Sequence, residues 1–257
     1  MILRCNKKNI LLINKVVFFK YGGAQIYFSA RGRKNKPVNI FLHGWGQSGD
    51  CFKEIIASLP GFYNIAIDFP PFGKSGEAEG FTIFSYVEML IAFCEHNKIT
   101  KCNLIGHSFG GRVAILVSAL RNDLVDRLVL IASAGMKPKR KLSYFVNVFC
   151  YKCLKFLGCP PKNAGSSDYK KLSTAMQKTF VNVVNTHLEE YCPLIEAETL
   201  IIFGENDNQT PIYMAKRLKK LIKNSQLVVL KHAGHFCFIE RKIQVCQFLQ
   251  QFLKEDA

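Results

Sequence analysis

The sequence lacks the features that mark several classes of protein. No stretch approaches the ~18 consecutive apolar residues that a membrane-spanning helix requires, and no internal repeat or low-complexity tract occurs. No zinc-finger, RNA-binding or basic-zipper pattern is present, and no histidine pair at zinc-ligand spacing accompanies the cysteines. These absences argue against a membrane-spanning protein, a repeat protein, a nucleic-acid-binding module and a metal site.

Acidic residues are also scarce. The chain has 19 Asp and Glu against 35 Lys and Arg, which gives a formal net charge of +16. Such a charge bears on partners and solubility rather than on the fold. Because the basic residues are spread over several predicted helices, we interpret most of them as solvated helix faces, and we expect no nucleic-acid partner.

A convincing export signal is lacking as well. Three basic residues precede a short apolar run, 10–13, as in a signal peptide, but Asn14 and Lys15 interrupt that run. We therefore expect a cytoplasmic protein. Its ten cysteines are then most simply reduced thiols that are buried as small hydrophobic side chains.

What is present is an alternation of apolar strands with helices. The length of 257 residues, nearly half of them apolar, suits one α/β domain with a sizeable core. The alternation from Pro37 onward predicts a mostly parallel sheet. The predicted strands are Val16–Tyr21, Gln25–Ala30, Pro37–Leu42, Tyr63–Phe69, Lys101–Ile105, Val125–Ala132, Thr199–Phe203 and Leu227–Leu230, of which the first two form an antiparallel hairpin. The predicted helices are Asp50–Leu59 with Asp50 as N-cap, Thr82–Asn97, Arg112–Leu120, Pro211–Lys223 and Ile239–Leu253.

The alternation is interrupted once, over approximately 136–197. This segment has helical, aromatic and basic residues and no clear strand. We interpret it as a small insertion on the sheet and treat residues 1–257 as a single domain.

The most informative motif is G-x-S-x-G at residues 106–110. An apolar strand leads into it and a helix-like segment leaves it, which is the context of a nucleophile elbow. In such an elbow Ser108 occupies a strained turn that exposes its hydroxyl at the carboxyl edge of the sheet. We expect glycine at 106 and 110 because the strand and helix backbones crowd there.

A serine hydroxyl becomes a good nucleophile only when a base removes its proton and a third group orients that base. His235 is the preferred base because it follows the last strand and Gly234, with His232 as its competitor. Asp207, in the loop after the preceding strand, is the preferred acid, with Glu205 as its competitor. His107 is set aside because alternating side-chain directions should turn it away from Ser108, and His43 because it precedes the elbow and starts a glycine turn.

Two backbone N–H groups are needed to bind the oxyanion that forms when the serine attacks. One is the N–H of Phe109, at the start of the helix after the elbow, where the helix dipole also favours an anion. The second is assigned to Trp45, in the glycine-containing loop after the strand Pro37–Leu42. Removing one such donor typically costs about 3 kcal/mol of transition-state stabilisation.

Together these blocks resemble the α/β-hydrolase superfamily. The matching segments are residues 43–46, 68–75, 106–111, 204–207 and 234–235, in the order and spacing of that family. The resemblance covers roughly 16–134 and 199–253 and implies an eight-stranded sheet, a chain order of serine, acid and histidine, and no cofactor. It also implies that the insertion is a cap over the substrate pocket. One departure is Pro71, where the family usually has glycine.

The resemblance is to small carboxylesterases, including the pimeloyl-ester esterase of biotin synthesis, and to carbon–carbon bond hydrolases of aromatic breakdown. It implies a hydrolase that cleaves an ester or related acyl substrate through Ser108, Asp207 and His235. Two alternatives stay open: cleavage of a carbon–carbon bond in a diketone-like substrate, and a non-hydrolytic member of the fold that binds a ligand.

The start of the insertion is both basic and aromatic. Lys137, Lys139, Arg140 and Lys141 open it, and further lysines follow among tyrosines and phenylalanines. The favoured interpretation is a hydrophobic roof whose lysines are solvated. The alternative is contact with an anionic substrate or with an anionic lipid surface, at about 1 kcal/mol for each basic residue near the membrane. In that case binding should weaken as the ionic strength rises.

Overall fold

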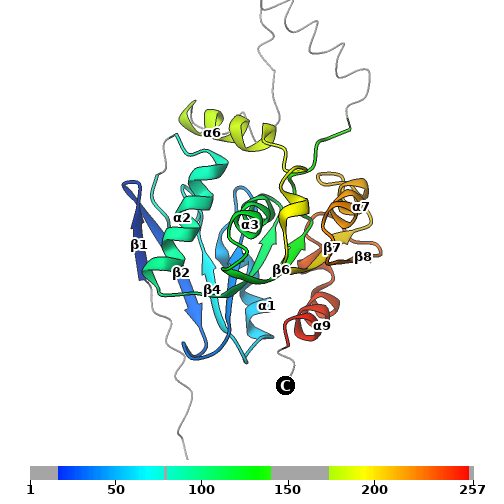
Figure 1. Cartoon of the computed structure of the whole chain (residues 1–257), viewed down its shortest axis with the longest axis horizontal. Helices are drawn as coiled ribbons and strands as arrows, with labels where there is room; N and C mark the ends of the chain where they lie inside the picture. The colour runs from blue at the N-terminus through cyan, green and yellow to red at the C-terminus, as the bar shows by residue number, and fades with distance from the viewer. Residues whose placement is uncertain (1–16, 78–79, 140–173, 255–257) are drawn as a thin grey trace, which may run out of the picture.

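The computed structural model describes residues 17–77, 80–139 and 174–254. They form an eight-stranded sheet in the order β1-β2-β4-β3-β5-β6-β7-β8. Only β2 runs antiparallel to its neighbours, β1 and β4, and the remaining pairs are parallel. The predicted mostly parallel sheet with an antiparallel first hairpin is therefore confirmed (Figure 1).

The strands lie close to the predicted positions. The central strands are mostly apolar and almost entirely buried because helices cover both of their faces. The strands are β1 Val17–Tyr21, β2 Ala24–Arg31, β3 Val38–Leu42, β4 Tyr63–Ile67, β5 Cys102–His107, β6 Val125–Ile131, β7 Glu198–Gly204 and β8 Ser225–Leu230.

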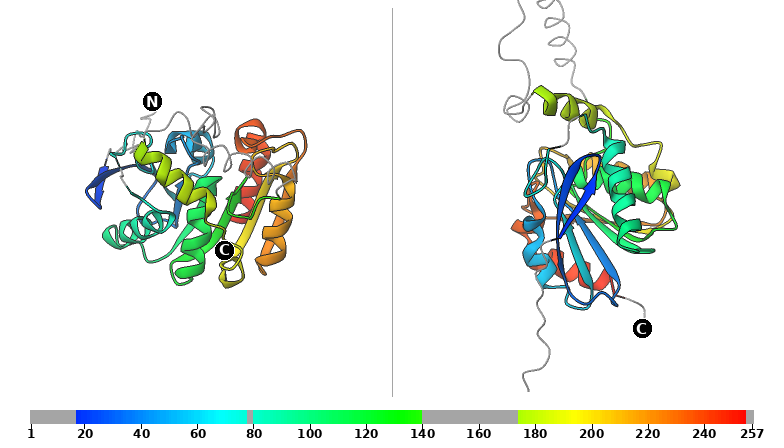
Figure 2. Two further views of the ribbon diagram at one scale, coloured as in Figure 1. Left: turned by 90° about the horizontal axis from the view of Figure 1, so that it is seen from above. Right: turned by 90° about the vertical axis from the view of Figure 1, so that its left-hand side faces the viewer.

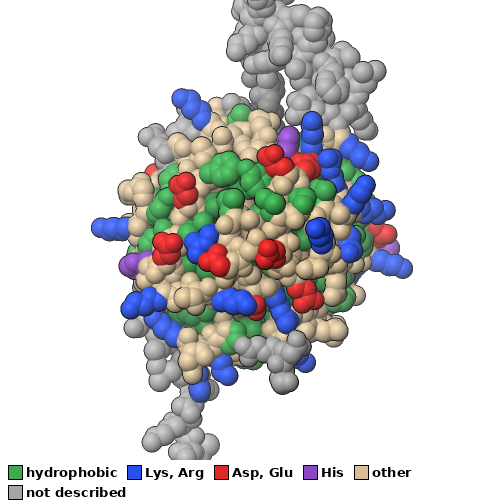
Figure 3. Space-filling model, in the orientation of Figure 1, with side chains coloured by type: hydrophobic (Ala, Val, Ile, Leu, Met, Phe, Trp, Pro, Cys, Tyr) green, Lys and Arg blue, Asp and Glu red, His purple; other side chains and the backbone are tan. Residues whose placement is uncertain are grey.

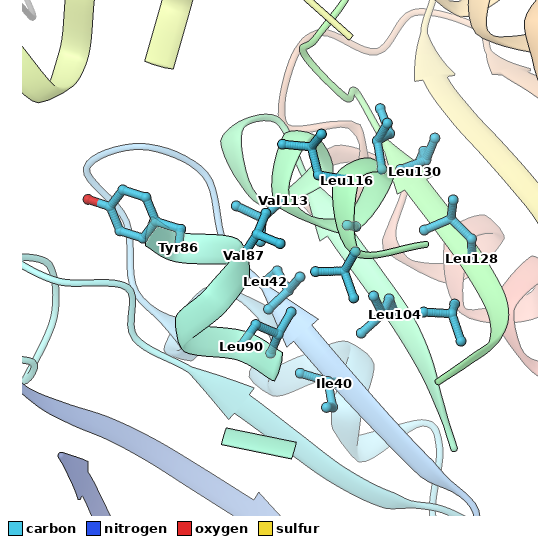
Figure 4. Packing of buried hydrophobic residues seen from close by; sticks show 14 of the residues in the cluster. Ile40, Leu42, Tyr86, Val87, Leu90, Leu104, Val113, Leu116, Leu128 and Leu130 are labelled. Carbon is cyan, nitrogen blue, oxygen red and sulfur yellow. The ribbon is translucent and has the colours of Figure 1, made fainter. Parts of the chain in front are cut away.

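Helices cover the two faces of the sheet in separate layers (Figure 2). One face packs against α2 Ile83–His96, α3 Phe109–Leu120 and α7 Ile212–Leu221, and the other against α1 Lys53–Ala57, α8 Cys237–Glu240 and α9 Lys242–Phe252. Figure 4 shows how the first layer is filled: Leu42 and Leu104 of the sheet point toward Val87 of α2 and Val113 of α3. All four are buried. Ser108 lies directly before α3, so this helix also positions the site.

Two details of the predicted helices were wrong. The segment after β3 starts as a 3₁₀ turn, Gly49–Phe52, before α1, and Asp50 is not its N-cap. Instead, the side chain of Asp68, the residue directly after β4, accepts the N–H of Gly49 at the start of this turn. The closing helix is also interrupted at Arg241, between α8 and α9.

The described part of the insertion contains one α-helix, α6 Thr174–Asn185, followed by a 3₁₀ turn, Cys192–Leu194. Figure 1 shows α6 across the top of the sheet, above α2 and α3. The Asn182 side chain accepts the N–H of Ile83 at the start of α2 (3.2 Å), which ties this helix to the core.

The surface agrees with the interpretation of the high charge. On the face shown in Figure 3, Lys and Arg side chains are spread around the outline, with acidic side chains between them. Within the described ranges, no helix has the length and apolar character needed to cross a bilayer.

Candidate functional site

Ser108 occupies the strained turn that the motif predicts. It lies between β5 and α3 with φ 50° and ψ −108°, in a region that residues with a side chain seldom adopt. A Cβ on Gly106 would meet the Gly110 carbonyl oxygen at 2.6 Å, and a Cβ on Gly110 would meet the Leu42 carbonyl oxygen at 2.0 Å. Both glycines are therefore required by close backbone approach, as predicted.

Asp207 and His235 come together from two loops at the same edge of the sheet. The loop after β7 carries Asp207, the loop after β8 carries His235, and Asp207 Oδ2 lies 2.8 Å from His235 Nδ1. Both side chains are almost completely buried. A short hydrogen bond in such surroundings fixes the orientation of the imidazole ring.

Both oxygens of the Asp207 carboxylate are occupied. Oδ1 accepts the backbone N–H groups of Gln209 (2.8 Å) and Thr210 (2.9 Å), and the Thr210 hydroxyl lies 2.7 Å from Oδ2. Burial by itself raises the pKa of Asp207, but the hydrogen bonds from His235 and Thr210 outweigh it and lower the pKa below its usual value. An ionised carboxylate only accepts hydrogen bonds, so His235 Nδ1 carries a proton and Nε2 is the nitrogen that can accept one.

Ser108 and His235 face one cavity of about 700 Å³. It is lined by residues from the loops after the parallel strands β3 to β8, from the start of α3 and from α6. The lining residues are Gly44, Trp45, Gly46, Gln47, Phe72, His107, Ser108, Phe109, Arg112, Ala134, Phe180, Val183, Val184, Gln209, Thr210, His235 and Phe236.

The two residues assigned to the oxyanion hole stand side by side in this cavity. The rings of Trp45 and Phe109 meet edge to face with centroids 5.4 Å apart, and Trp45 also contacts Phe180 of α6 at 5.2 Å. Phe109 is the first residue of α3. All five predicted site residues are thus gathered at one edge of the sheet: four line the cavity, and Asp207 lies behind His235.

The competing residues have other contacts. The Glu205 side chain accepts the backbone N–H of His232 (3.2 Å) at an exposed position, and neither residue lines the cavity. His43 is fully buried below the site. It accepts the Phe69 N–H on Nε2 (2.8 Å), so its Nδ1 carries the proton and donates to the Gly44 carbonyl (2.8 Å). This arrangement agrees with a structural part for His43.

His107 contacts the site through His235 and lines the cavity. Its side chain does not turn away from the site but packs against His235, with ring centroids 4.9 Å apart. Its Nε2 lies 3.1 Å from the His235 carbonyl oxygen, to which it donates.

These two buried histidines predict that the protein loses stability in mild acid. Burial lowers the pKa of His43 to about 4, and burial together with the neighbouring His235 lowers the pKa of His107 to about 3. Below the usual histidine pKa of 6.5 the unfolded chain binds protons that the folded chain does not. The free energy of unfolding should therefore fall by up to about 1.4 kcal/mol per pH unit and per histidine between pH 6.5 and 4.

Denaturant unfolding at pH 7, 6 and 5 checks this prediction, with the fluorescence of Trp45, the single tryptophan, as the signal. His43→Asn should flatten the pH dependence, because it removes a group whose pKa is lowered by burial. A free energy of unfolding that stays constant over this range would contradict the prediction.

Sequence reasoning missed several residues of the site. Thr210 was overlooked although it follows the acid by three residues. Arg112 was overlooked although it lies in the first turn of the helix that follows Ser108. Nothing in the local sequence of α6 indicates that this helix lines the cavity. The basic and aromatic stretch from Arg140 onward lies outside the described residues, so the question of its anionic partner stays a prediction.

The fold and the site define a class: α/β proteins with a serine on a strand-to-helix turn and an aspartate–histidine pair beside it. The sequence model of the family described as "alpha/beta hydrolase fold" matches residues 37–153 and 161–242. The chain therefore belongs to the α/β-hydrolase fold family.

Relatives with assigned names lie at low identity. The chain is similar to a pimeloyl-[acyl-carrier protein] methyl ester esterase of Vibrio vulnificus (23% identical, covering 84% of this chain and 94% of the relative). It is also similar to a 2-hydroxy-6-oxo-6-(2'-aminophenyl)hexa-2,4-dienoic acid hydrolase of Metapseudomonas resinovorans (26%, covering 93% and 91%). Among solved structures, an esterase from Exiguobacterium antarcticum matches with a TM-score of 0.77 at 20% identity, covering 94% of this chain and all of that one, which bears on the fold alone. The family and these names place the chain among hydrolases.

Proposed function

We propose that this protein is a serine hydrolase that cleaves an ester or a related acyl compound through an acyl-enzyme. The observation that carries the proposal is the buried hydrogen bond between Asp207 and His235, beside a cavity that also contains Ser108. This bond leaves His235 Nε2 as a base, and Ser108 is held in a turn that exposes its hydroxyl. An adjacent base and its orienting group are what a serine nucleophile requires.

In the proposed reaction Ser108 Oγ attacks the carbonyl carbon while His235 Nε2 takes the hydroxyl proton. The N–H groups of Trp45 and Phe109 bind the oxyanion, and the start of α3 adds the positive end of a helix dipole. His235 then donates the proton to the leaving alcohol oxygen, and the carbonyl–alcohol bond breaks. A water molecule, deprotonated by His235 Nε2, then attacks the acyl carbon. His235 returns this proton to Ser108 Oγ as the bond between the acyl carbon and Oγ breaks, which releases the acid and restores the serine.

Cleavage of a carbon–carbon bond is the second candidate. It is favoured by the likeness to the hexadienoic acid hydrolase, and it would use the same site with a carbon leaving group. The ester proposal ranks first because it needs no group to stabilise a carbanion, and because the likeness to the methyl ester esterase supports it.

Labelling with a fluorophosphonate tests the proposal directly, because the reagent reacts only with a serine that an adjacent base activates. We expect wild-type protein to be labelled at Ser108 and to hydrolyse short-chain p-nitrophenyl esters, and we expect Ser108→Ala to do neither. Labelling without ester turnover would favour the carbon–carbon reaction. Absence of both would indicate a ligand-binding member of the fold.

A further inference from the structure

Arg112 is a buried cation in the wall of the cavity. It lies in the first turn of α3, four residues after Ser108. The residue is only 7% exposed, and it lines the cavity together with Ser108. Apart from the histidines beside Ser108, the rest of the lining has no ionisable side chain.

The guanidinium has no anionic partner among the described residues. Nη1 donates to the Thr186 carbonyl (2.6 Å) and Nη2 to the Val184 carbonyl (3.4 Å), and no carboxylate of the described residues lies within ion-pair distance of Arg112. The carboxylate that influences it, Glu189, already accepts the Lys137 N–H (2.6 Å) and pairs with Arg217 (3.4 Å). Burial lowers the pKa of Arg112 to about 10, so the group stays charged at neutral pH.

A purely structural role explains the two hydrogen bonds of Arg112 but not its buried charge. The two carbonyls lie at the end of α6, so Arg112 does fasten that helix over the cavity. Two neutral N–H donors would serve the same purpose without burying a charge. A buried charge without a counter-ion is costly, and a guanidinium has five N–H donors in a fork that matches a carboxylate.

We propose that Arg112 binds a carboxylate of the substrate, so that the natural substrate is an acyl compound with a free carboxylate a few carbon atoms from the carbonyl that Ser108 attacks. The chemical class is a monoester of a dicarboxylic acid, or a similar acyl compound of an anionic acid. The inference rests on the proposed function. Trp45, Phe180 and Val183 form the apolar wall against which the intervening carbons pack.

Paired substrates test the proposal by kinetics. The mono-p-nitrophenyl esters of straight-chain diacids, from succinate to suberate, are compared with the same esters whose free carboxylate is capped by methyl. For at least one chain length, wild-type protein should prefer the anionic ester by kcat/KM. In Arg112→Gln the ratio of kcat/KM for the anionic ester to that for the capped ester should fall about 10- to 100-fold, which is what a lost hydrogen bond to a charged group typically costs.

Two further variants separate this effect from a structural one. Arg112→Lys keeps the charge and should retain part of the preference for the anionic ester. Arg121→Gln removes a partly exposed arginine directly after the far end of α3 and should leave the ratio at its wild-type value. If Arg112 only fastens α6, Arg112→Gln changes kcat/KM for both esters by the same factor. A constant ratio at every chain length therefore overturns the proposal.

A binding measurement separates this inference from the proposed function. Ser108→Ala is titrated with monomethyl adipate and with dimethyl adipate, and the fluorescence of Trp45, which borders the cavity, reports binding. The monoanion should bind more tightly, and adding Arg112→Gln should remove that preference. If the preference is present but no ester is hydrolysed, the proposed function fails and the anion site stands. If esters are hydrolysed and neither measurement responds to Arg112→Gln, the hydrolase stands and the anion site is wrong.

Discussion

Ser108→Ala and His235→Ala should each lower kcat for ester hydrolysis on the order of 10⁶-fold, and the double variant should lose no more than either single one. The two side chains act as one unit: without the base the Ser108 hydroxyl stays protonated, and without the hydroxyl the base has nothing to activate. Residual activity over water should remain in all three variants, because the N–H groups of Trp45 and Phe109 are backbone groups that these substitutions leave in place.

Matched controls exist on the same elements. Ser118→Ala removes a buried hydroxyl of α3 that has no hydrogen-bond partner among the described residues, and it should keep wild-type kcat. His232→Asn changes the neighbouring histidine, whose φ of 54° asparagine tolerates, and should also keep it. Single variants whose losses multiply in the double variant would show that Ser108 and His235 do not act together.

The residues around the elbow could be predicted because their constraints are local. A strand, a tight turn and a helix meet within residues 102–120, and each step has its own residue preference. Gly106 is required by the backbone of Gly110 within that segment, whereas Gly110 is required by the Leu42 carbonyl at the end of the neighbouring strand β3. The order of the parallel strands then places the loops after β7 and β8 at the same edge, which is why Asp207 and His235 could be named from the sequence.

The remaining parts of the site depend on contacts between segments distant in the chain. Arg112 stands in an otherwise apolar helix, and nothing nearby indicates that it reaches the carbonyls of Val184 and Thr186, more than seventy residues away. The contact of His107 with His235 likewise joins residues that are 128 positions apart in the chain. Asp50 was misassigned as a helix cap because a carboxylate from the end of another strand, Asp68, fills that position.

Asp207→Asn should lower kcat by about 10⁴-fold while the fold is retained. The contacts of Asp207 explain why the asparagine amide would fix the wrong tautomer of the histidine. The position of Oδ1 faces the backbone N–H groups of Gln209 and Thr210, so only the amide oxygen fits there. The amide NH₂ must then occupy the position of Oδ2, facing His235 Nδ1. That nitrogen would have to accept, so the ring proton would move to Nε2, where it blocks the abstraction of the Ser108 proton.

The test compares kcat and denaturant unfolding of Asp207→Asn with those of Glu205→Gln, which removes the carboxylate two residues earlier in the same loop. Glu205→Gln should retain wild-type kcat, because its side chain contacts only the exposed backbone at His232. The loss in Asp207→Asn should appear in kcat without a matching loss in the free energy of unfolding, since the two backbone hydrogen bonds to the side-chain oxygen persist. If Glu205→Gln is the damaging change, or if Asp207→Asn retains kcat, Asp207 does not orient His235 in the reaction.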